Sequence, residues 1–129
     1  MDIAVICAAG RSGKTIVSEA ASRGHNVTAF IRPSDNAPDF PPEVVIEIRD
    51  LFDLDRETLR RFDAVIDCFG VWDDSLAELH IKSVKHLCAC LSGEKARLMI
   101  VGGAGSLYTD SGHKRKFHEE PSFPSDMKV

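Results

Sequence analysis

The residues Ile3–Thr15, with the sequence IAVICAAGRSGKT, decide the predicted fold of this chain. They begin with an apolar run, Ile3–Cys7, that has the length of a buried strand, and they pass through residues 8–10 into a helix that we expect to start at Ser12 or Gly13. A strand, a tight glycine turn and a helix N-terminus together form an anion site, because free backbone N–H groups and the positive end of the helix dipole converge there. The stretch therefore predicts an α/β domain that binds a phosphate-containing ligand at its first turn.

Size and composition are those of one globular domain. The chain has 129 residues, of which 43% are hydrophobic and 28% charged, and its formal net charge is −4. This charge provides no attraction for nucleic acid, and no apolar run approaches the ~20 residues of a membrane span. The four cysteines lack the spacing of a zinc site or a disulfide framework. We therefore expect free thiols, no metal, no nucleic-acid or membrane partner, and a cytoplasmic protein.

Apolar segments alternate with helical patterns along the chain. Further strands are expected at Val27–Ile31, Val44–Ile48, Ala64–Cys68 and Arg97–Val101, and further helices at Leu54–Phe62 and 76–91. This alternation predicts βαβ units and hence a parallel sheet. Right-handed crossovers and a ligand at the first turn favour strand order 3-2-1-4-5, which is a doubly wound, Rossmann-like α/β fold. We expect residues 1–108 to form this domain and residues 109–129, where periodicity ends, to be an irregular tail.

The first turn fits a dinucleotide-binding fingerprint. Residues 7–13 (CAAGRSG) match the pattern Gly-x-x-Gly-x-x-Gly, with Cys7 in place of the first glycine. Gly10 would let the backbone approach a pyrophosphate, and Gly13 would let the helix pack closely on the strand. An ordinary turn between a strand and a helix is the alternative interpretation. The candidate cofactor-binding residues of this turn are Ala9, Gly10, Arg11, Ser12 and Gly13.

Arg32 bears on which dinucleotide is bound. In NAD-binding domains an acidic residue at the end of the second strand, ~20 residues beyond the glycines, holds the ribose 2′-hydroxyl. Arginine occupies that place here, and a guanidinium group suits a phosphate because it can donate two charge-assisted hydrogen bonds. We therefore predict NADP(H) in preference to NAD(H). A surface arginine that simply precedes Pro33 is the alternative.

Two other strand ends supply candidate binding residues, because ligands gather at the carboxyl edge of a parallel sheet. Asp50 would hydrogen-bond the adenine and Leu51 would cover its face, unless the two residues only cap and pack the following helix. Phe69 and Gly70 would border the nicotinamide ribose, where Gly70 gives the cofactor close access to the backbone. These residues extend the predicted site across the sheet.

Two cysteines end neighbouring strands in the predicted order. Cys7 follows the first strand and Cys68 closes the fourth, and adjacent strands lie ~4.8 Å apart. We therefore expect both thiols to border the cofactor groove and hypothesise that their oxidation blocks binding. The alternative is that both are small buried residues without a redox role.

The segment Gly102–Tyr108, GGAGSLY, follows the fifth strand. Three glycines within four residues indicate close approach to a ligand, and Gly103 is the candidate contact. Ser106 would hydrogen-bond a substrate carbonyl and Tyr108 would donate a proton, which makes them the candidate catalytic residues. Tyr108 lacks the lysine of a Tyr-x-x-x-Lys pair, because Gly112 stands four residues later.

The first turn also fits a nucleotide-hydrolase motif. Residues 8–15 (AAGRSGKT) match Walker A with alanine in the first position. A P-loop would place Lys14 on the β- and γ-phosphates and Thr15 on magnesium. This interpretation gives Arg32 no role, so we prefer the dinucleotide site.

Taken together, these segments resemble the NmrA-like, atypical short-chain dehydrogenase group, and within it the NADH-flavin reductase or NAD(P)H-binding members. The resemblance covers Asp2 to about Lys128, and it is carried by AAGRSGK, RGHNVTAFIR, RDLFD, FDAVIDCFG and RLMIVGGAGSLY. It implies a Rossmann fold that holds NADP(H) at Gly10–Gly13, with Arg32 on the 2′-phosphate. It further implies adenine contacts and a ligand pocket at Asp50-Leu51, Phe69-Gly70 and Gly103–Ser106.

The chain departs from this group in two ways. Cys7 replaces the usual first glycine, which would alter the turn or lower affinity. Members of the group also continue well past this chain, so we expect a truncated product or fragment that contains the cofactor half and little of the substrate half. The fifth strand would then be an open edge, which leaves room for a homo-oligomer.

The sequence thus predicts an NADP(H)-binding oxidoreductase-like protein that transfers a hydride to a small-molecule acceptor, a flavin or a quinone-like compound. A non-enzymatic NADP(H) sensor or partner-binding module is the second hypothesis, favoured by the missing Tyr-x-x-x-Lys pair and the short chain. A P-loop nucleotide-binding protein is the third.

Overall fold

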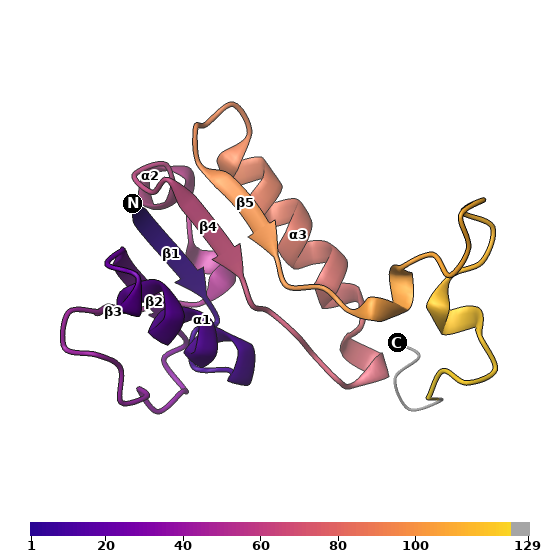
Figure 1. Cartoon of the computed structure of the whole chain (residues 1–129). Coiled ribbons are helices and arrows are strands. Elements are labelled where there is room, and N and C mark those ends of the chain that lie inside the picture. Colours follow the sequence, from indigo (N-terminus) through magenta and orange to yellow (C-terminus); the bar gives the residue numbers. More distant parts are fainter. Residues whose placement is uncertain (125–129) are drawn as a thin grey trace.

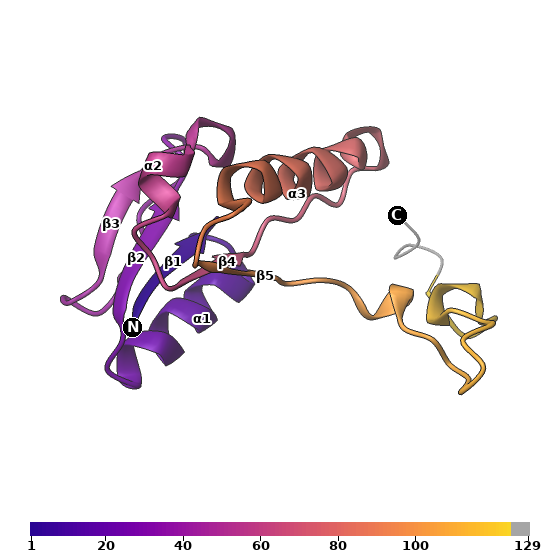
Figure 2. The ribbon, with the colours of Figure 1, turned by 90° about the horizontal axis from the view of Figure 1, so that it is seen from above.

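The computed structural model describes residues 1–124 of the chain, apart from the side chain of Asp74. The last part of the expected tail, residues 125–129, lies outside the described residues. A five-stranded sheet forms the centre of the molecule, with helices on both faces (Figures 1 and 2). Its strands are β1 (Asp2–Ile6), β2 (Asn26–Ile31), β3 (Val45–Ile48), β4 (Ala64–Asp67) and β5 (Arg97–Ile100).

All the strand pairings in this sheet are parallel, and the strand order is β3-β2-β1-β4-β5. The predicted Rossmann-like fold class and strand order are therefore confirmed. β1 is central, because Val5 pairs with Ala29 of β2 on one side and with Ile66 of β4 on the other. From β1 the chain continues to β2 and β3 on one side of the sheet and then crosses to β4 on the other side of β1. The switch point of the strand order therefore lies between β1 and β4. In doubly wound sheets, ligands bind in the crevice outside the carboxyl ends of the strands at such a switch point.

Helix α1 (Arg11–Ser22) covers one face of the sheet (Figure 2) and starts one or two residues earlier than the expected Ser12 or Gly13. Its Gly13 packs directly on the end of β1, where an added Cβ would lie 2.6 Å from the Cα of Ala8. The helix ends at Ser22, and Gly24 follows its C-cap with a φ of +77°, a left-handed conformation that glycine adopts without steric cost. Its buried residues are Gly13, Val17, Ala20 and Ala21.

The opposite face is covered by α2 (Arg56–Leu59) and α3 (Glu78–Leu91), with the 3₁₀ turn η2 (Asp74–Leu76) before α3 (Figure 2). Successive residues of a strand point to opposite faces, so the sheet separates two hydrophobic cores. The core under α1 includes Ile3, Val5, Val17, Val27, Ala29 and Ile31. The core under α2 and α3 includes Ile6, Phe30, Leu51, Leu54, Leu59, Val65 and Leu87. Among residues 1–124, no helix is long and apolar enough to cross a bilayer.

The helix expected at Leu54–Phe62 is shorter than predicted and is preceded by a separate 3₁₀ turn, η1 (Leu51–Asp53). Asp50 caps η1, and its carboxylate accepts a backbone N–H at 3.0 Å. Asp55 caps α2 in the same way at 2.8 Å. Aspartate satisfies the free N–H groups at a helix start, so two aspartates five residues apart begin two short elements instead of one helix.

The two outer strands expose apolar side chains. On β5, Met99 is 50% exposed and Ile100 is 49% exposed. On β3, Val45 and Ile48 are 56% and 63% exposed. Within the described part of the chain no further strand pairs with β5, so the open edge expected from the sequence is present and can associate with another strand.

Residues 102–124 leave the sheet after β5 and pack on themselves at a distance from the helices (Figure 2). They contain two 3₁₀ turns, η3 (Ala104–Ser106) and η4 (Phe117–Glu119). An antiparallel bridge joins Tyr108 to Lys116. The carboxylate of Asp110 closes the loop between them by accepting the backbone N–H groups of residues 114 and 115 at 3.0 and 2.8 Å. Local hydrogen bonds therefore hold this segment, which includes residues 109–124 of the expected irregular tail and has no long regular element.

We predict that Gly13→Ala destabilises the protein by about 1–3 kcal/mol, the usual cost of overpacking. The added Cβ would lie 2.6–2.8 Å from backbone atoms of residues 7 and 8, and backbone cannot move aside as a flexible side chain can. Urea unfolding followed by circular dichroism measures the change. Gly102→Ala is the matched control, because nothing lies within 4 Å of a Cβ added there. Equal stability of the two variants would contradict this account of the α1–β1 contact.

Candidate functional site at the carboxyl edge of the sheet

The carboxyl ends of β1, β2 and β4 enclose a groove of about 220 Å³, here called the carboxyl-edge groove. Its position at the switch point is the one expected for a ligand site in this fold. Three chain segments supply its walls: the turn after β1, the start of the loop after β2, and the loop between β4 and α3. Its lining residues are Cys7, Ala9, Gly10, Arg32, Asp35, Cys68, Phe69, Gly70 and Val71.

The turn after β1 leaves backbone donors free at the start of α1. The N–H of Gly10 donates to the carbonyl of Cys7 at 3.1 Å, and the first helical hydrogen bond runs from Lys14 N–H to the carbonyl of Gly10 at 2.9 Å. No side chain caps the helix and its first turn holds no acidic residue. The N–H groups of Arg11, Ser12 and Gly13 are therefore without a partner among residues 1–124. Such donors, with the positive end of the helix dipole, attract an anion.

Cys7 adopts a backbone conformation that suits glycine. Its φ is +57°, in the left-handed region that a residue with a Cβ enters at a cost of about 1–2 kcal/mol. This is the position of the first glycine in the dinucleotide fingerprint, so the chain keeps the turn geometry in spite of the substitution. Burial raises the pKa of the Cys7 thiol to about 12, and the nearby carboxylate of Asp67 adds to the rise.

Cys7 and Cys68 both line the groove, as expected from the strand order. Burial also raises the pKa of Cys68, to about 11. The thiolate is the form that oxidises, so both groups stay protonated and weakly reactive at neutral pH. This chemistry argues against the hypothesis that oxidation of the pair regulates the groove. All four cysteines are free.

Arg32 lies in the groove wall at the end of β2, but its guanidinium already has a partner. Asp35 holds it through two hydrogen bonds, Nη2 to Oδ1 at 2.9 Å and Nε to Oδ2 at 3.2 Å. The arginine side chain is 59% exposed and the aspartate side chain 18% exposed. The guanidinium lowers the pKa of Asp35, so the carboxylate is ionised at neutral pH. Arg32 was predicted as a site residue from its place after the second strand, whereas Asp35 was not predicted.

The loop after β4 is fixed by two residues that the sequence analysis did not place in the site. The carboxylate of Asp67 accepts the backbone N–H of Phe69 at 2.9 Å, and burial raises the pKa of this acid. The His80 ring packs edge-on against the Phe69 ring with centroids 5.6 Å apart, and its Nε2 lies 3.2 Å from the carbonyl oxygen of Val71. Phe69 and Gly70 are thereby held in the groove wall. The only indication of these two residues in the sequence was that Asp67, an acidic residue, lies at the end of an apolar strand.

Two candidate adenine contacts are already used within the protein. The carboxylate of Asp50 accepts the N–H of Phe52 at 3.0 Å as the cap of η1. Leu51 is 3% exposed and belongs to the core under α3, so its side chain does not cover the groove. The 3₁₀ turn directs Leu51 inward, which corresponds to the capping and packing alternative.

The candidate catalytic residues lie outside the carboxyl-edge groove. The Ser106 hydroxyl donates to the carbonyl of Gly103 at 3.3 Å, and none of Gly103, Ser106 and Tyr108 lines the groove. The Tyr108 ring stacks on His113 with centroids 4.8 Å apart. At Gly105 an added Cβ would lie 3.2 Å from the ring of Phe123. This glycine therefore permits close approach of the chain's own tail.

The first turn does not have the form of a P-loop. In a P-loop the Gly-Lys-Thr sequence opens the helix, so that the loop before it wraps the phosphates. Here α1 begins at Arg11, and Lys14 and Thr15 are exposed positions within it. The Thr15 hydroxyl donates to the carbonyl of Arg11 at 3.2 Å. No group of three or more potential metal ligands occurs among residues 1–124.

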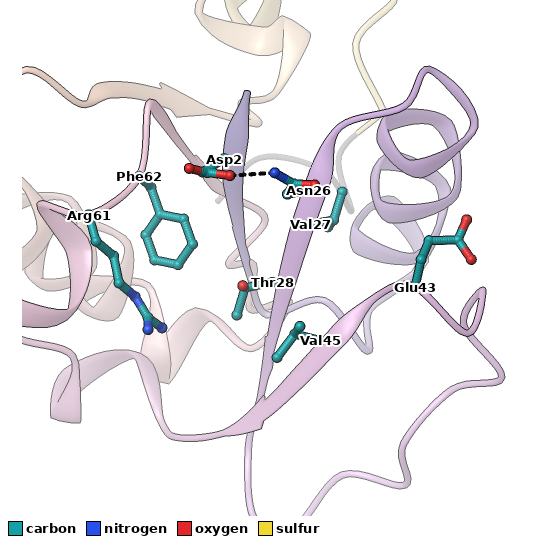
Figure 3. A pocket seen from close by; sticks show the side chains of 8 residues that line it. All are labelled: Asp2, Asn26, Val27, Thr28, Glu43, Val45, Arg61 and Phe62. Carbon is teal, nitrogen blue, oxygen red and sulfur yellow. Dashed lines mark hydrogen bonds between the residues drawn. The ribbon is translucent and has the colours of Figure 1, made fainter.

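A larger hollow of about 460 Å³ lies at the opposite, amino edge of the sheet. Figure 3 shows Asp2 hydrogen-bonded to the Asn26 side chain at its rim, at 2.8 Å, with Phe62 beside them. Arg61, which also lines it, forms an ion pair with Glu47. This hollow has neither a glycine turn nor a helix N-terminus, so the smaller carboxyl-edge groove is the better candidate.

The sequence of this chain is similar to a known protein family and to an individual relative. The profile of a family described as NAD(P)H-binding matches residues 7–125. YwnB of Bacillus subtilis, an uncharacterised protein, is 36% identical over 127 residues, which are 98% of this chain and 58% of YwnB.

Among solved structures, SP1627 of Streptococcus pneumoniae, named "a putative NADH-flavin reductase", is 42% identical, with a TM-score of 0.89 over 99% of this chain and 59% of SP1627. Lmo0794 of Listeria monocytogenes is 38% identical, with a TM-score of 0.71 over 84% of this chain and 63% of Lmo0794. The chain thus spans 58% and 59% of the lengths of YwnB and SP1627.

We predict that Cys7→Gly is more stable than Cys7→Ala by about 1 kcal/mol, because alanine keeps the left-handed strain and glycine removes it. Both variants lose the thiol, so their difference isolates the backbone term. The opposite order is expected for Cys88→Gly and Cys88→Ala, since Cys88 is exposed within α3 and glycine weakens a helix. Urea midpoints of the four variants measure this. If the alanine variant is the more stable one at both positions, backbone strain at Cys7 does not lower the stability of the protein.

Proposed function

Since this chain belongs to the NAD(P)H-binding family, we propose that it binds NADP(H) in the carboxyl-edge groove and acts as the cofactor domain of an oxidoreductase. The observation that carries this proposal is the meeting of two phosphate-binding features in one groove. The uncapped N–H groups lie at the start of α1, next to Gly10, and Arg32 lines the groove at the end of β2. A dinucleotide with a 2′-phosphate presents anionic groups to both.

The diphosphate would bind at the start of α1. Gly10 and Gly13 bring the backbone close, and the N–H groups of Arg11, Ser12 and Gly13 would donate to phosphate oxygens. Ala9 lines the groove beside them and leaves room because its side chain is small. Backbone N–H groups supply the donors of this part of the site, so their positions are set by the fold and not by the ligand.

The adenosine end would lie over the end of β2. Arg32 is the candidate for the 2′-phosphate because a guanidinium can hold a phosphate through paired hydrogen bonds. Asp50 stays a proposed neighbour of the adenine through its unshared oxygen, whereas we assign no ligand contact to Leu51. From Arg32 alone, we therefore predict that the groove binds NADP(H) more tightly than NAD(H).

The nicotinamide end would lie against Phe69 and Gly70. Nothing lies within 4 Å of a Cβ added at Gly70, so the space above this residue is open. When bound, the nicotinamide supplies a hydride. The protein would position the ring and limit the access of water. We propose a flavin or a quinone-like compound as the acceptor, supported by the name of SP1627 and its 42% identity to this chain.

We propose residues 1–108 as the cofactor domain and residues 109–129 as the beginning of a region that contacts the substrate. The groove is built from segments that end at Val71, so the described tail is not needed to form it. Ser106 and Tyr108 would lie at the end of the cofactor domain, next to the substrate region. In this arrangement they would act on an acceptor instead of the cofactor.

We expect calorimetric titration to show NADPH binding that weakens about tenfold or more in Arg32→Ala, the loss of a charge-assisted hydrogen-bond pair. NADH affinity should change much less, because NADH has no 2′-phosphate. Arg23→Ala is the matched control, since Arg23 is an exposed arginine at the far end of α1 that pairs with Glu19. Absence of binding by both cofactors would refute the proposed site.

A second function, a non-enzymatic NADP(H)-binding module, is favoured by one observation. The described chain places no hydroxyl group in the groove, because Ser106 bonds within its own turn and Tyr108 stacks on His113. Consumption of NADPH in the presence of a flavin, followed by absorbance, separates the two functions. A reductase should exceed the protein-free rate, with a loss in Arg32→Ala at low NADPH. Binding without turnover would identify the module.

A further inference from the structure

We propose that Asp35 lets the groove accept NADH as well as NADPH, by binding the ribose 2′-hydroxyl of NADH and by competing with the 2′-phosphate of NADPH for Arg32. This inference rests on the proposed function, since it concerns the adenosine end of the same groove. It differs from that proposal in assigning the discrimination between cofactors to a pair of opposite charges instead of to Arg32 alone.

Asp35 is fixed in place by its own turn. Its backbone N–H donates to the carbonyl of Arg32 at 3.0 Å, and Pro33 occupies the second position of this four-residue turn, a place that proline favours. Its Oδ2 also lies 3.3 Å from the backbone nitrogen of Arg32. The carboxylate therefore does not depend on a flexible chain for its position. It lines the groove together with Arg32 and Gly10.

The ion pair changes what Arg32 can offer a phosphate. Asp35 occupies Nε and one side of Nη2, at 3.2 and 2.9 Å, and leaves Nη1 free to donate. A 2′-phosphate at Arg32 would also come close to the carboxylate, and like charges repel. Arg32 is thus weakened as a phosphate clamp without being removed from the groove.

The same carboxylate offers NADH a partner. In NAD-binding domains an acidic side chain at the end of the second strand accepts the ribose 2′-hydroxyl. Asp35 is three residues beyond Arg32 in the same loop, and its pairing with Arg32 lowers its pKa, so it is an ionised acceptor at neutral pH. Asp50 is less suited, because it does not line the groove. The Arg32–Asp35 pair therefore contains one group for each form of the ribose.

The test is calorimetric titration of the full chain with NADPH and with NADH, for the wild type and for Asp35→Asn. We expect Asp35→Asn to bind NADPH about five- to tenfold more tightly and NADH about five- to tenfold more weakly, the range of one charge-assisted interaction gained or lost. The gain for NADPH should shrink as salt is added, because screening reduces charge repulsion. Asp39→Asn is the matched control, since it removes the same charge from an exposed position in the same loop. Both affinities should then stay within about twofold of the wild type.

Circular dichroism verifies that each variant is folded, and Asp35→Ser replaces Asp35→Asn if the amide variant does not fold. A preference that is unchanged in Asp35→Asn, or affinities that move in parallel, would overturn this inference while leaving the proposed function intact. Failure of the wild type to bind either cofactor would overturn both. A wild type that binds NADPH and excludes NADH would also overturn the inference alone.

Discussion

The close packing of α1 on β1 at Gly13 is the constraint on which the candidate site depends. With no Cβ between them, the helix axis lies against the end of the strand, where an alanine would meet Ala8 at 2.6 Å. The N–H groups that α1 leaves uncapped belong to the same first turn of the helix, which begins directly after Gly10 of the groove wall. Cys7, which precedes Ala8 in this turn, takes a φ of +57°.

Charge in the groove is balanced with little excess of either sign. The two thiols are neutral because burial raises the pKa of both, and Arg32 is paired with Asp35. The attraction for an anion therefore comes mainly from backbone amides and the helix dipole, which act over a short range. Binding of a dinucleotide would rely on the fit of its diphosphate to the turn, with the ribose end adjusting the preference between cofactors. A groove of this kind is selective by contact more than by long-range attraction.

Strand order and turn position could be predicted from the sequence because each follows from a local pattern and a general rule. Apolar runs locate the strands, and the handedness of crossovers then allows few orders, among them the one observed. Asp35 could not be predicted, since its pairing depends on a turn whose geometry no periodicity reveals. Leu51 and Tyr108 were placed in the site by their position after strands, but the direction of a side chain in a 3₁₀ turn or a loop is set by packing. The ends of the strands thus predict where a site lies, but they do not predict which side chains face it.

The groove is complete without the outer strand β5. Its walls come from the loops after β1, β2 and β4, whereas β5 carries the half-exposed Met99 and Ile100 at the far side of the sheet. The proposed cofactor site and the open edge at β5 therefore lie in different parts of one sheet. In the proposed function an acceptor would have to reach the nicotinamide, and nothing lies within 4 Å of a Cβ added at Gly70. YwnB and SP1627 are longer than this chain. Under the proposed function their additional residues would bear on the acceptor, whereas the proposed dinucleotide contacts lie at the ends of β1, β2, β3 and β4.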